Sequence, residues 1–315
     1  MIAVSDLIRR IFNKSKKSAT QSSGPTPIPP SPDQLGHSPY RPSPPETVNG
    51  ISGGGRLNPP QVIVGIGHST GLQRDHNEDA LFTLTTNLIS DSHILPFGLY
   101  IVADGMGGHE HGEEASGVAV RAMASHVISR LLNPMIDLPP QSPVESIQQI
   151  MQDGIQSAHS AILSQAPGGG TTLTAILILS DQMTIVHVGD SRAYALQQDG
   201  HIEMLTRDHS LVNRLVELGQ ITSAEAAVHP QRNVLYRALG QGEPVDAEVI
   251  SAPFPRSGHL LLCSDGLWGV VPESQVTEIV FSTSSPCQAC QNLVIAANQA
   301  GGPDNISVIL LRLPD

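Results

Sequence analysis

The 315-residue sequence predicts an α+β domain, with antiparallel sheets packed face to face and helices outside, behind a disordered N-terminal extension. Short apolar runs of strand type come in blocks, and helical patterns interrupt them in only a few places. Such grouping is typical of α+β folds rather than of regular βαβ alternation. A stretch rich in Pro, Ser and Gly ahead of the first strand-like run predicts the extension.

Residues 1–17 predict a short basic amphipathic helix, because apolar side chains recur at helical spacing while basic residues take other faces. The apolar positions are Val4, Leu7, Ile8, Ile11 and Phe12. Such a helix can lie on an anionic membrane surface or dock weakly into a partner groove. The alternatives are a frayed terminus and a helix packed on its own domain, and the sequence leaves all of these open.

Residues 18–60 predict a disordered linker, since repeated prolines and glycines accompany almost nothing apolar to bury. The prolines could bind aromatic-grooved modules, but a plain spacer is the commoner use of this composition. The folded domain is expected over residues 61–315.

Within that domain, nine runs predict strands and four predict helices. The strand runs are 62–67, 81–85, 99–103, 171–179, 184–188, 193–196, 247–250, 260–263 and 306–313. The helical patterns are 113–132, 144–164, 272–281 and 287–300. Residues 208–239 are mixed and polar, so we expect a surface lobe over the site.

Charge and cysteine content narrow the function classes. Residues 61–315 carry ten basic and twenty-six acidic side chains, a net charge of −16 that argues against nucleic acid as a partner. Three cysteines without framework spacing suggest a reducing interior. No apolar run reaches the roughly 18 residues of a spanning helix, and no signal-peptide core is seen. We therefore expect a cytoplasmic monomer, peripheral at a membrane if residues 2–17 bind one.

Carboxylates stand where apolar runs end, at five widely separated places. They are Asp79 with Glu78 beside it, Asp104, Asp190, Asp265 and Asp304. Carboxylates delivered to the ends of buried strands can converge in one cleft, and cations must neutralise them if they are to share it ionised. Each Asp-Gly pair alone reads as a turn. Together the five places predict a multi-metal hydrolase site.

This pattern resembles the metal-dependent Ser/Thr protein phosphatases of the 2C type, and in its details the bacterial branch. The motifs that carry the resemblance lie at 74–79, 102–114, 170–172, 187–192, 205–210, 237–240, 264–268 and 302–307. They occur in order over nearly the whole folded domain. The resemblance implies a central antiparallel β-sandwich between helical layers and the hydrolysis of phosphoserine and phosphothreonine, plausibly opposing a Ser/Thr kinase.

The resemblance also implies a role for each site residue. Asp79 would bridge two Mn2+ or Mg2+ ions, with Asp104 and the Gly105 carbonyl on one side and Asp265 and Asp304 on the other. Glu78 would hold a water on the metal, and a hydroxide bridging the ions would attack phosphorus directly.

Two further residues take roles at the edge of this implied site. Arg74 would grip the phosphomonoester with its planar fork, the alternative being a surface ion pair with Asp75 or Glu78. Asp190 could help Asp265 hold a weak third ion, and its alternative is a turn with an ion pair to Arg192.

Two departures from the family pattern affect these expectations. Met106 stands where eukaryotic relatives place a proton-donating His, so the general acid is unassigned, although His109 and His111 are nearby. Gly269 stands where many relatives have an acid, which would weaken a third ion site.

Several other residues are expected to be structural. His187 and Trp268 are expected to pack around the site, and Cys287 and Cys290 to be buried as small hydrophobic residues. The remaining functional alternatives are a phosphopeptide-binding pseudophosphatase and a hydrolase of small phosphoesters.

Overall fold

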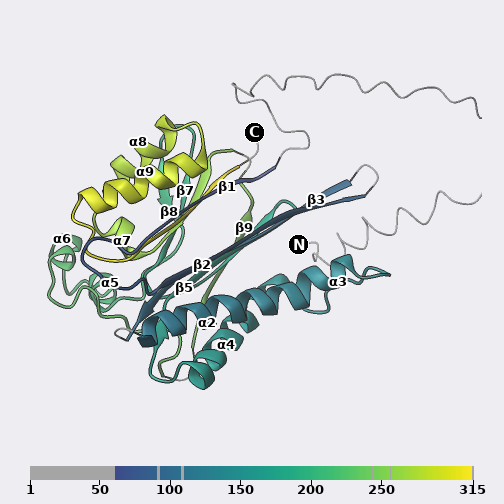
Figure 1. The fold of residues 1–315 in the computed structure, drawn as a ribbon, viewed down its shortest axis with the longest axis horizontal. Helices are drawn as coiled ribbons and strands as arrows, with labels where there is room; N and C mark the ends of the chain where they lie inside the picture. The colour runs from purple at the N-terminus through teal and green to yellow at the C-terminus, as the bar shows by residue number, and fades with distance from the viewer. Residues whose placement is uncertain (1–60, 91–92, 108–109, 243–244, 256, 314–315) are drawn as a thin grey trace, which may run out of the picture.

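A computed structural model describes residues 61–313 except 91–92, 108–109, 243–244 and 256. In this part of the chain two antiparallel sheets pack face to face, and helices cover both outer faces (Figure 1). The predicted α+β sandwich is confirmed. The predicted helix over 1–17 and linker over 18–60 lie outside the described residues.

The first sheet has five strands in the order β1-β11-β10-β7-β8. Their bounds are β1 Ile63–Ser69, β7 Arg192–Leu196, β8 Ile202–Met204, β10 His259–Cys263 and β11 Ile306–Arg312. Helices α8 (Glu273–Ser282) and α9 (Pro286–Gln299) lie over its outer face (Figure 1). Gly65 permits this packing, because a Cβ atom there would collide with the backbone of Pro286 at the start of α9.

The second sheet has the order β2-β3-β5-β6-β9, with β4 paired to β3. Its strands are β2 Asp79–Ser90, β3 His93–Met106, β4 Gly170–Thr171, β5 Leu173–Leu179, β6 Gln182–Val188 and β9 Glu248–Pro253. Helices α2 (Glu110–Val127) and α4 (Ile147–Gln165) cover this sheet. A π-helical turn at Ile128–Leu132 and α3 (Asn133–Ile136) continue α2.

Three apolar layers hold these elements together, one under each helical layer and one between the sheets. Strand β5 shows why its sequence is apolar throughout. Leu173 and Leu177 face the helices α2 and α4, while Ile176 and Ile178 face the other sheet. A strand covered on both faces has no solvent side, so the usual alternation of polar and apolar residues disappears.

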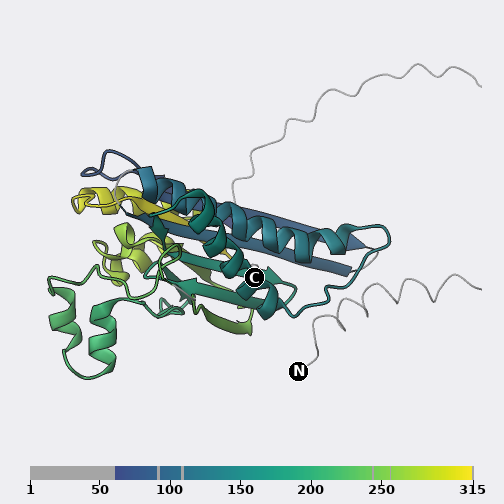
Figure 2. The same ribbon diagram turned by 90° about the horizontal axis from the view of Figure 1, so that it is seen from below.

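Residues 208–239 form a lobe that projects from one end of the sandwich (Figure 2). It contains two short helices, α5 (Leu211–Glu217) and α6 (Ser223–Ala227). Thr222 and Glu225 form a capping box at the start of α6, and none of the α6 residues is buried. The predicted surface lobe is therefore present, but its two helices were not predicted.

The structure corrects the predicted elements in other places. The prediction missed β8 and the single-turn helix α7 (Asp265–Trp268), both too short to show a periodic pattern. Cys290 is buried as expected, but Cys287 is exposed because it lies on the outer side of α9. Among the described residues no helix is both long and apolar enough to cross a membrane.

Candidate active site

The predicted carboxylates meet at one end of the sandwich, each delivered by the end of a strand. Asp79 and Asp104 are direct partners in the β2–β3 register. Asp190 lies between β6 and β7, Asp265 begins α7 after β10, and Asp304 comes just before β11. A cavity of about 230 Å3 is lined by seven of the predicted residues: Arg74, Glu78, Asp104, Gly105, Asp190, Asp265 and Asp304.

Asp104 is held in place by the threonines of strand β4 and the start of β5. Its N–H donates to Thr172 Oγ1 at 2.9 Å. Its carbonyl accepts from Thr171 Oγ1 at 2.8 Å and from the Thr172 N–H at 2.9 Å. These bonds fix the backbone and leave the carboxylate of Asp104 to face the cavity.

Asp79 lies beneath the cavity and is 6% exposed. One of its carboxylate oxygens accepts a hydrogen bond of 2.8 Å from Ser264 Oγ, and that hydroxyl accepts from the Ser307 N–H at 2.9 Å. The side chains of the two sheets are thus linked directly under the site.

Asn305 ties the loop before β2 to the start of β11. Its side-chain oxygen accepts from the Glu78 N–H at 2.8 Å, and its amide donates to the carbonyls of Thr70 and His76 at 2.8 and 2.9 Å. The loop that carries Arg74 and Glu78 is therefore fixed relative to Asp304.

Burial and mutual repulsion raise the carboxyl pKa values in this cluster. Burial first, then the charges of Asp265 and Asp304, raises the pKa of Asp79 to about 7, although the hydrogen bond from Ser264 opposes the rise. Burial and neighbouring acids raise the pKa of Asp190 to about 8 and of Asp265 to about 6. The pKa of Asp104 is raised well above its usual value by burial and then by Asp79. Such a cluster is stable in its ionised form only with compensating positive charge.

The chemistry of the donors fits hard cations. One oxygen each of Asp79 and Asp265 is buried without a hydrogen-bond partner among the described residues, which leaves a lone pair for a cation. The Gly105 backbone also fits this reading, since a Cβ atom there would collide with the carbonyls of Glu78 and Gly112. These are the oxygen ligands that Mg2+ and Mn2+ prefer.

No three His, Cys, Asp or Glu side chains among the described residues form a group that could hold one ion by themselves. This agrees with the coordination preference of Mg2+, which usually keeps several water ligands and binds only one or two carboxylates. The carboxylates would therefore share ions, with water completing each coordination sphere.

Arg74 is half exposed and lies 2.7 Å from Asp304, between Nη2 and Oδ2. The sequence offered Asp75 or Glu78 as alternative partners, and the structure selects neither for a direct ion pair. Arg74 lines the same cavity as the carboxylates, so its guanidinium stands at the mouth of the acidic site.

Arg192 joins three parts of the molecule rather than pairing with Asp190 as the turn alternative expected. It donates two hydrogen bonds to Asp208, of 3.0 and 2.7 Å, and its guanidinium carbon lies 3.6 Å from the centre of the Trp268 ring. The Trp268 indole N–H donates to the Asp190 carbonyl at 3.0 Å. Burial opposes the charge of Arg192, but Asp208 raises its pKa above the ordinary value.

His187 is fully buried and bonded on both ring nitrogens, to Thr174 Oγ1 and to the Arg207 carbonyl. Its pKa is lowered to about 4, mainly by burial. Both nitrogens have internal partners, as a structural role requires. Met106 lines the carboxylate cavity, while His109 lies outside the described residues, so the general acid is still unassigned.

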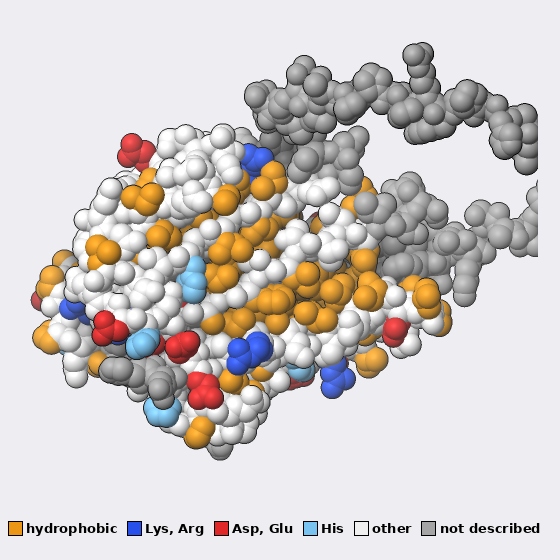
Figure 3. All heavy atoms as spheres, in the orientation of Figure 1, with side chains coloured by type: hydrophobic (Ala, Val, Ile, Leu, Met, Phe, Trp, Pro, Cys, Tyr) orange, Lys and Arg blue, Asp and Glu red, His pale blue; other side chains and the backbone are white. Residues whose placement is uncertain are grey.

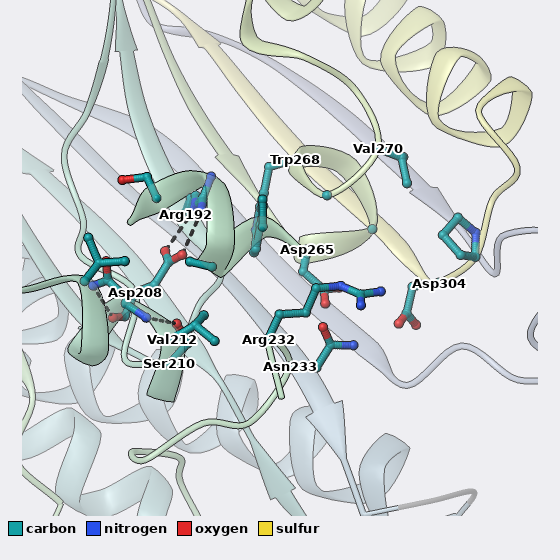
Figure 4. A pocket seen from close by; sticks show the side chains of 18 of the residues that line it. Arg192, Asp208, Ser210, Val212, Arg232, Asn233, Asp265, Trp268, Val270 and Asp304 are labelled. Carbon is teal, nitrogen blue, oxygen red and sulfur yellow. Dashed lines mark hydrogen bonds and ion pairs between the residues drawn. The ribbon is translucent and has the colours of Figure 1, made fainter. Parts of the chain in front are cut away.

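A larger cavity of about 610 Å3 adjoins the acidic one beneath the lobe (Figure 4). Asn233 lines both cavities, as do Arg74, Asp265 and Asp304. The functional analysis of the sequence missed Asn233, Ser264 and Asn305. Ser264 and Asn305 have partners distant in the chain, and their only signal was their place inside the matched motifs. Asn233 lies outside those motifs, in the segment where the sequence predicted only a surface lobe.

Comparisons with known proteins agree with this site. The family model described as protein phosphatase 2C matches residues 65–306. A protein of Listeria innocua named serine/threonine phosphatase stp is 38% identical over 250 residues, covering 77% of this chain and 92% of the relative. The serine/threonine protein phosphatase PstP of Mycobacterium tuberculosis is 33% identical over 251 residues, which cover 78% of this chain and 44% of PstP.

Solved structures show the same fold. The crystal structure of Mycobacterium tuberculosis PstP/Ppp superposes with a TM-score of 0.66 at 31% identity, covering 81% of this chain and all of that chain. A structure of the PstP catalytic domain in complex with two manganese ions superposes with a TM-score of 0.65 at 29% identity, covering 81% of this chain and 99% of the other.

Proposed function

Because this chain belongs to the protein phosphatase 2C family, we propose that it hydrolyses phosphoserine and phosphothreonine in proteins by direct attack of water activated between two Mn2+ or Mg2+ ions. Metal-dependent phosphoprotein phosphatase activity is the activity of this family. The observation that carries the finer proposal is the convergence of five aspartates from two sheets, with unpartnered oxygens on Asp79 and Asp265.

The residues of this chain divide the work as follows. Asp79 would bridge the ions, Asp104 and the Gly105 carbonyl would hold them from β3, and Asp265 and Asp304 would hold them from the other sheet. Glu78, at the end of the Asn305-bound loop, would orient water.

Two residues act around that core. Asp190 would share a weak third ion with Asp265, because Gly269 supplies no carboxylate. Arg74 would leave Asp304 in part to bind the phosphoryl oxygens with a planar pair of N–H donors.

We also propose a place in the cell for this activity. Three cysteines without a disulfide support the cytoplasm, where the enzyme would oppose a Ser/Thr kinase in signal transduction as a monomer. Residues 2–17 would dock it weakly on a membrane or partner, through their basic and apolar faces.

The test is hydrolysis of a phosphothreonine peptide by the purified protein with Mn2+, Mg2+ or EDTA. We expect turnover only with metal, and a loss of at least about 100-fold in kcat for Asp104→Asn and for Asp265→Asn, because each removes a charge from the ion site. Circular dichroism of both variants checks that they fold.

Each contrary outcome points to one alternative. A folded, metal-loaded protein without turnover would be a phosphopeptide-binding pseudophosphatase. Faster turnover of nucleotides and small phosphoesters than of any phosphopeptide would indicate a small-molecule hydrolase.

A further inference from the structure

We propose that Arg232 in the larger cavity binds a second anionic group of the substrate, on a residue flanking the phosphorylated one. This inference rests on the proposed function and adds a preference among phosphopeptides. The group is an oxyanion, either the carboxylate of Asp or Glu or a second phosphate.

The charges in this cavity single out Arg232. Three arginines line it, and two of them are neutralised within the protein: Arg74 by Asp304 at 2.7 Å and Arg192 by Asp208 at 2.7 Å. Arg232 has no carboxylate within ion-pair distance among the described residues, and its side chain forms no hydrogen bond there. Of the three arginines, Arg232 is the one whose charge has no carboxylate partner among the described residues.

The position of Arg232 connects it to the acidic site. Its side chain extends across the cavity toward the side where Asp265 and Asp304 lie (Figure 4). The next residue, Asn233, lines both this cavity and the carboxylate cavity. A peptide whose phosphate lies in the carboxylate cavity can therefore continue past Asn233 into the larger cavity and reach Arg232 there.

The rest of the cavity suits an extended peptide. Apolar side chains from the lobe, from α7 and from the segment after α7 form much of its wall: Val212, Val216, Ala226, Ala227, Trp268 and Val270. An apolar wall lowers the local dielectric, so an ion pair formed beside it is stronger than one in open water. In a domain of net charge −16, the guanidinium of Arg232, unpaired among the described residues, is a local point of attraction for a negative peptide group.

The experiment moves one glutamate through a phosphothreonine peptide, from four positions before to four positions after the phosphothreonine, in an otherwise neutral sequence. The enzyme is the full chain with Mn2+, as wild type and as Arg232→Gln and Arg214→Gln. Arg214 is the matched control, because it lies on the same lobe but pairs with Glu217 outside the cavity. Binding of each labelled peptide is measured by fluorescence anisotropy alongside kcat/KM.

We expect glutamate at one or two adjacent positions to raise the wild-type kcat/KM about three- to tenfold, the range for a partly exposed charged pair. Arg232→Gln should abolish that preference and leave the neutral peptide and p-nitrophenyl phosphate within about twofold. Arg214→Gln should keep the preference. Replacing the favoured glutamate with phosphoserine tells which oxyanion binds better.

The outcomes separate the two proposals. If the wild type binds and turns over all peptides equally, the proposed role of Arg232 is wrong, and the proposed hydrolysis still stands. The same holds if Arg232→Gln loses activity equally on every substrate. A glutamate preference in binding that Arg232→Gln removes, without turnover of any phosphopeptide, would uphold Arg232 and contradict the proposed hydrolysis.

Discussion

Asp79 shows at the scale of one residue how the site is prepared for cations. One oxygen is fixed by Ser264, and the other is buried without a partner among the described residues. Ionising such a group without a cation is unfavourable, because the second oxygen is buried away from bulk solvent and accepts no hydrogen bond from the described residues. The same carboxylate should therefore weaken the metal-free fold and strengthen the metal-bound one.

The pH dependence of unfolding tests this expectation. A carboxyl whose pKa rises on folding from 3.8 to about 7 stabilises the fold fully below pH 3.8, and that stability is lost as pH rises through 7. For Asp79 the loss is on the order of 4 kcal/mol. In EDTA, Asp79→Asn should unfold at higher urea concentration than the wild type at pH 8 and differ less at pH 5.

We expect metal to reverse the order of the unfolding midpoints of the wild type and Asp79→Asn. Mn2+ should raise the unfolding midpoint of the wild type at pH 8 and affect Asp79→Asn much less, because the variant lacks one carboxylate of the proposed ion site. If the wild type and Asp79→Asn have the same urea midpoint in EDTA at pH 8, the ionised Asp79 carboxylate does not destabilise the metal-free fold.

Arg74 gives a second prediction at this scale. If Arg74 binds the phosphoryl group as proposed, Arg74→Ala should lower kcat/KM about 10- to 100-fold for phosphopeptides and for p-nitrophenyl phosphate alike, because both substrates carry that group. Arg74→Lys should recover only part of the loss, since an ammonium cannot present the planar fork. Unchanged kinetics in Arg74→Ala, together with an altered Mn2+ requirement, would instead assign Arg74 to Asp304.

At the scale of elements, the lobe is joined to the sandwich by Arg192 of β7 and Asp208, just before α5. Both side chains are mostly buried, with exposures of 19% and 10%. The guanidinium is also stacked on Trp268 of α7, which is bonded to the Asp190 carbonyl. The lobe, α7 and the turn that carries Asp190 thus share one anchor.

Removing one member of that ion pair leaves a buried charge without its partner. Asp208→Ala should therefore destabilise the protein by about 3 kcal/mol in urea unfolding with metal present. Glu217→Ala, which breaks the exposed pair with Arg214, should cost less than about 1 kcal/mol. If the two variants lose the same free energy of unfolding, the Arg192–Asp208 pair stabilises the protein no more than the exposed Arg214–Glu217 pair does.

The sequence predicted long elements well and short or non-local features poorly. Helix α4 was recognised because its apolar residues recur at helical spacing, and strand β5 because a short unbroken apolar run is typical of a strand covered on both faces. Helix α7 was missed because one turn has no period, and β8 because its three residues resemble a loop. The aspartates were found through their place after strands, but the partner of Arg192 lies 16 residues away and no local rule selects it.

At the scale of the whole molecule, each of the two sheets contributes part of one site. Asp79 and Asp104 come from the sheet covered by α2 and α4, while Asp265 and Asp304 adjoin strands of the other sheet. The matched family region starts at residue 65 and β1 starts at Ile63, so every part of the site lies after the N-terminal extension.

Deletion of residues 1–60 should consequently leave the catalytic domain able to fold. We expect its thermal midpoint to change by less than about 2 °C and its kcat/KM for a phosphothreonine peptide by less than about twofold, since no site residue is removed. A truncated chain that unfolds readily would show that the first 60 residues pack on the domain.

The hydrogen bond from Ser264 to Asp79 crosses from one sheet to the other at the base of the site. A chain in which only one sheet has formed presents fewer than the full set of carboxylates and binds cations weakly. Cations would then select the completed molecule from partly folded ones during biosynthesis, and metal supply would govern how much finished enzyme accumulates.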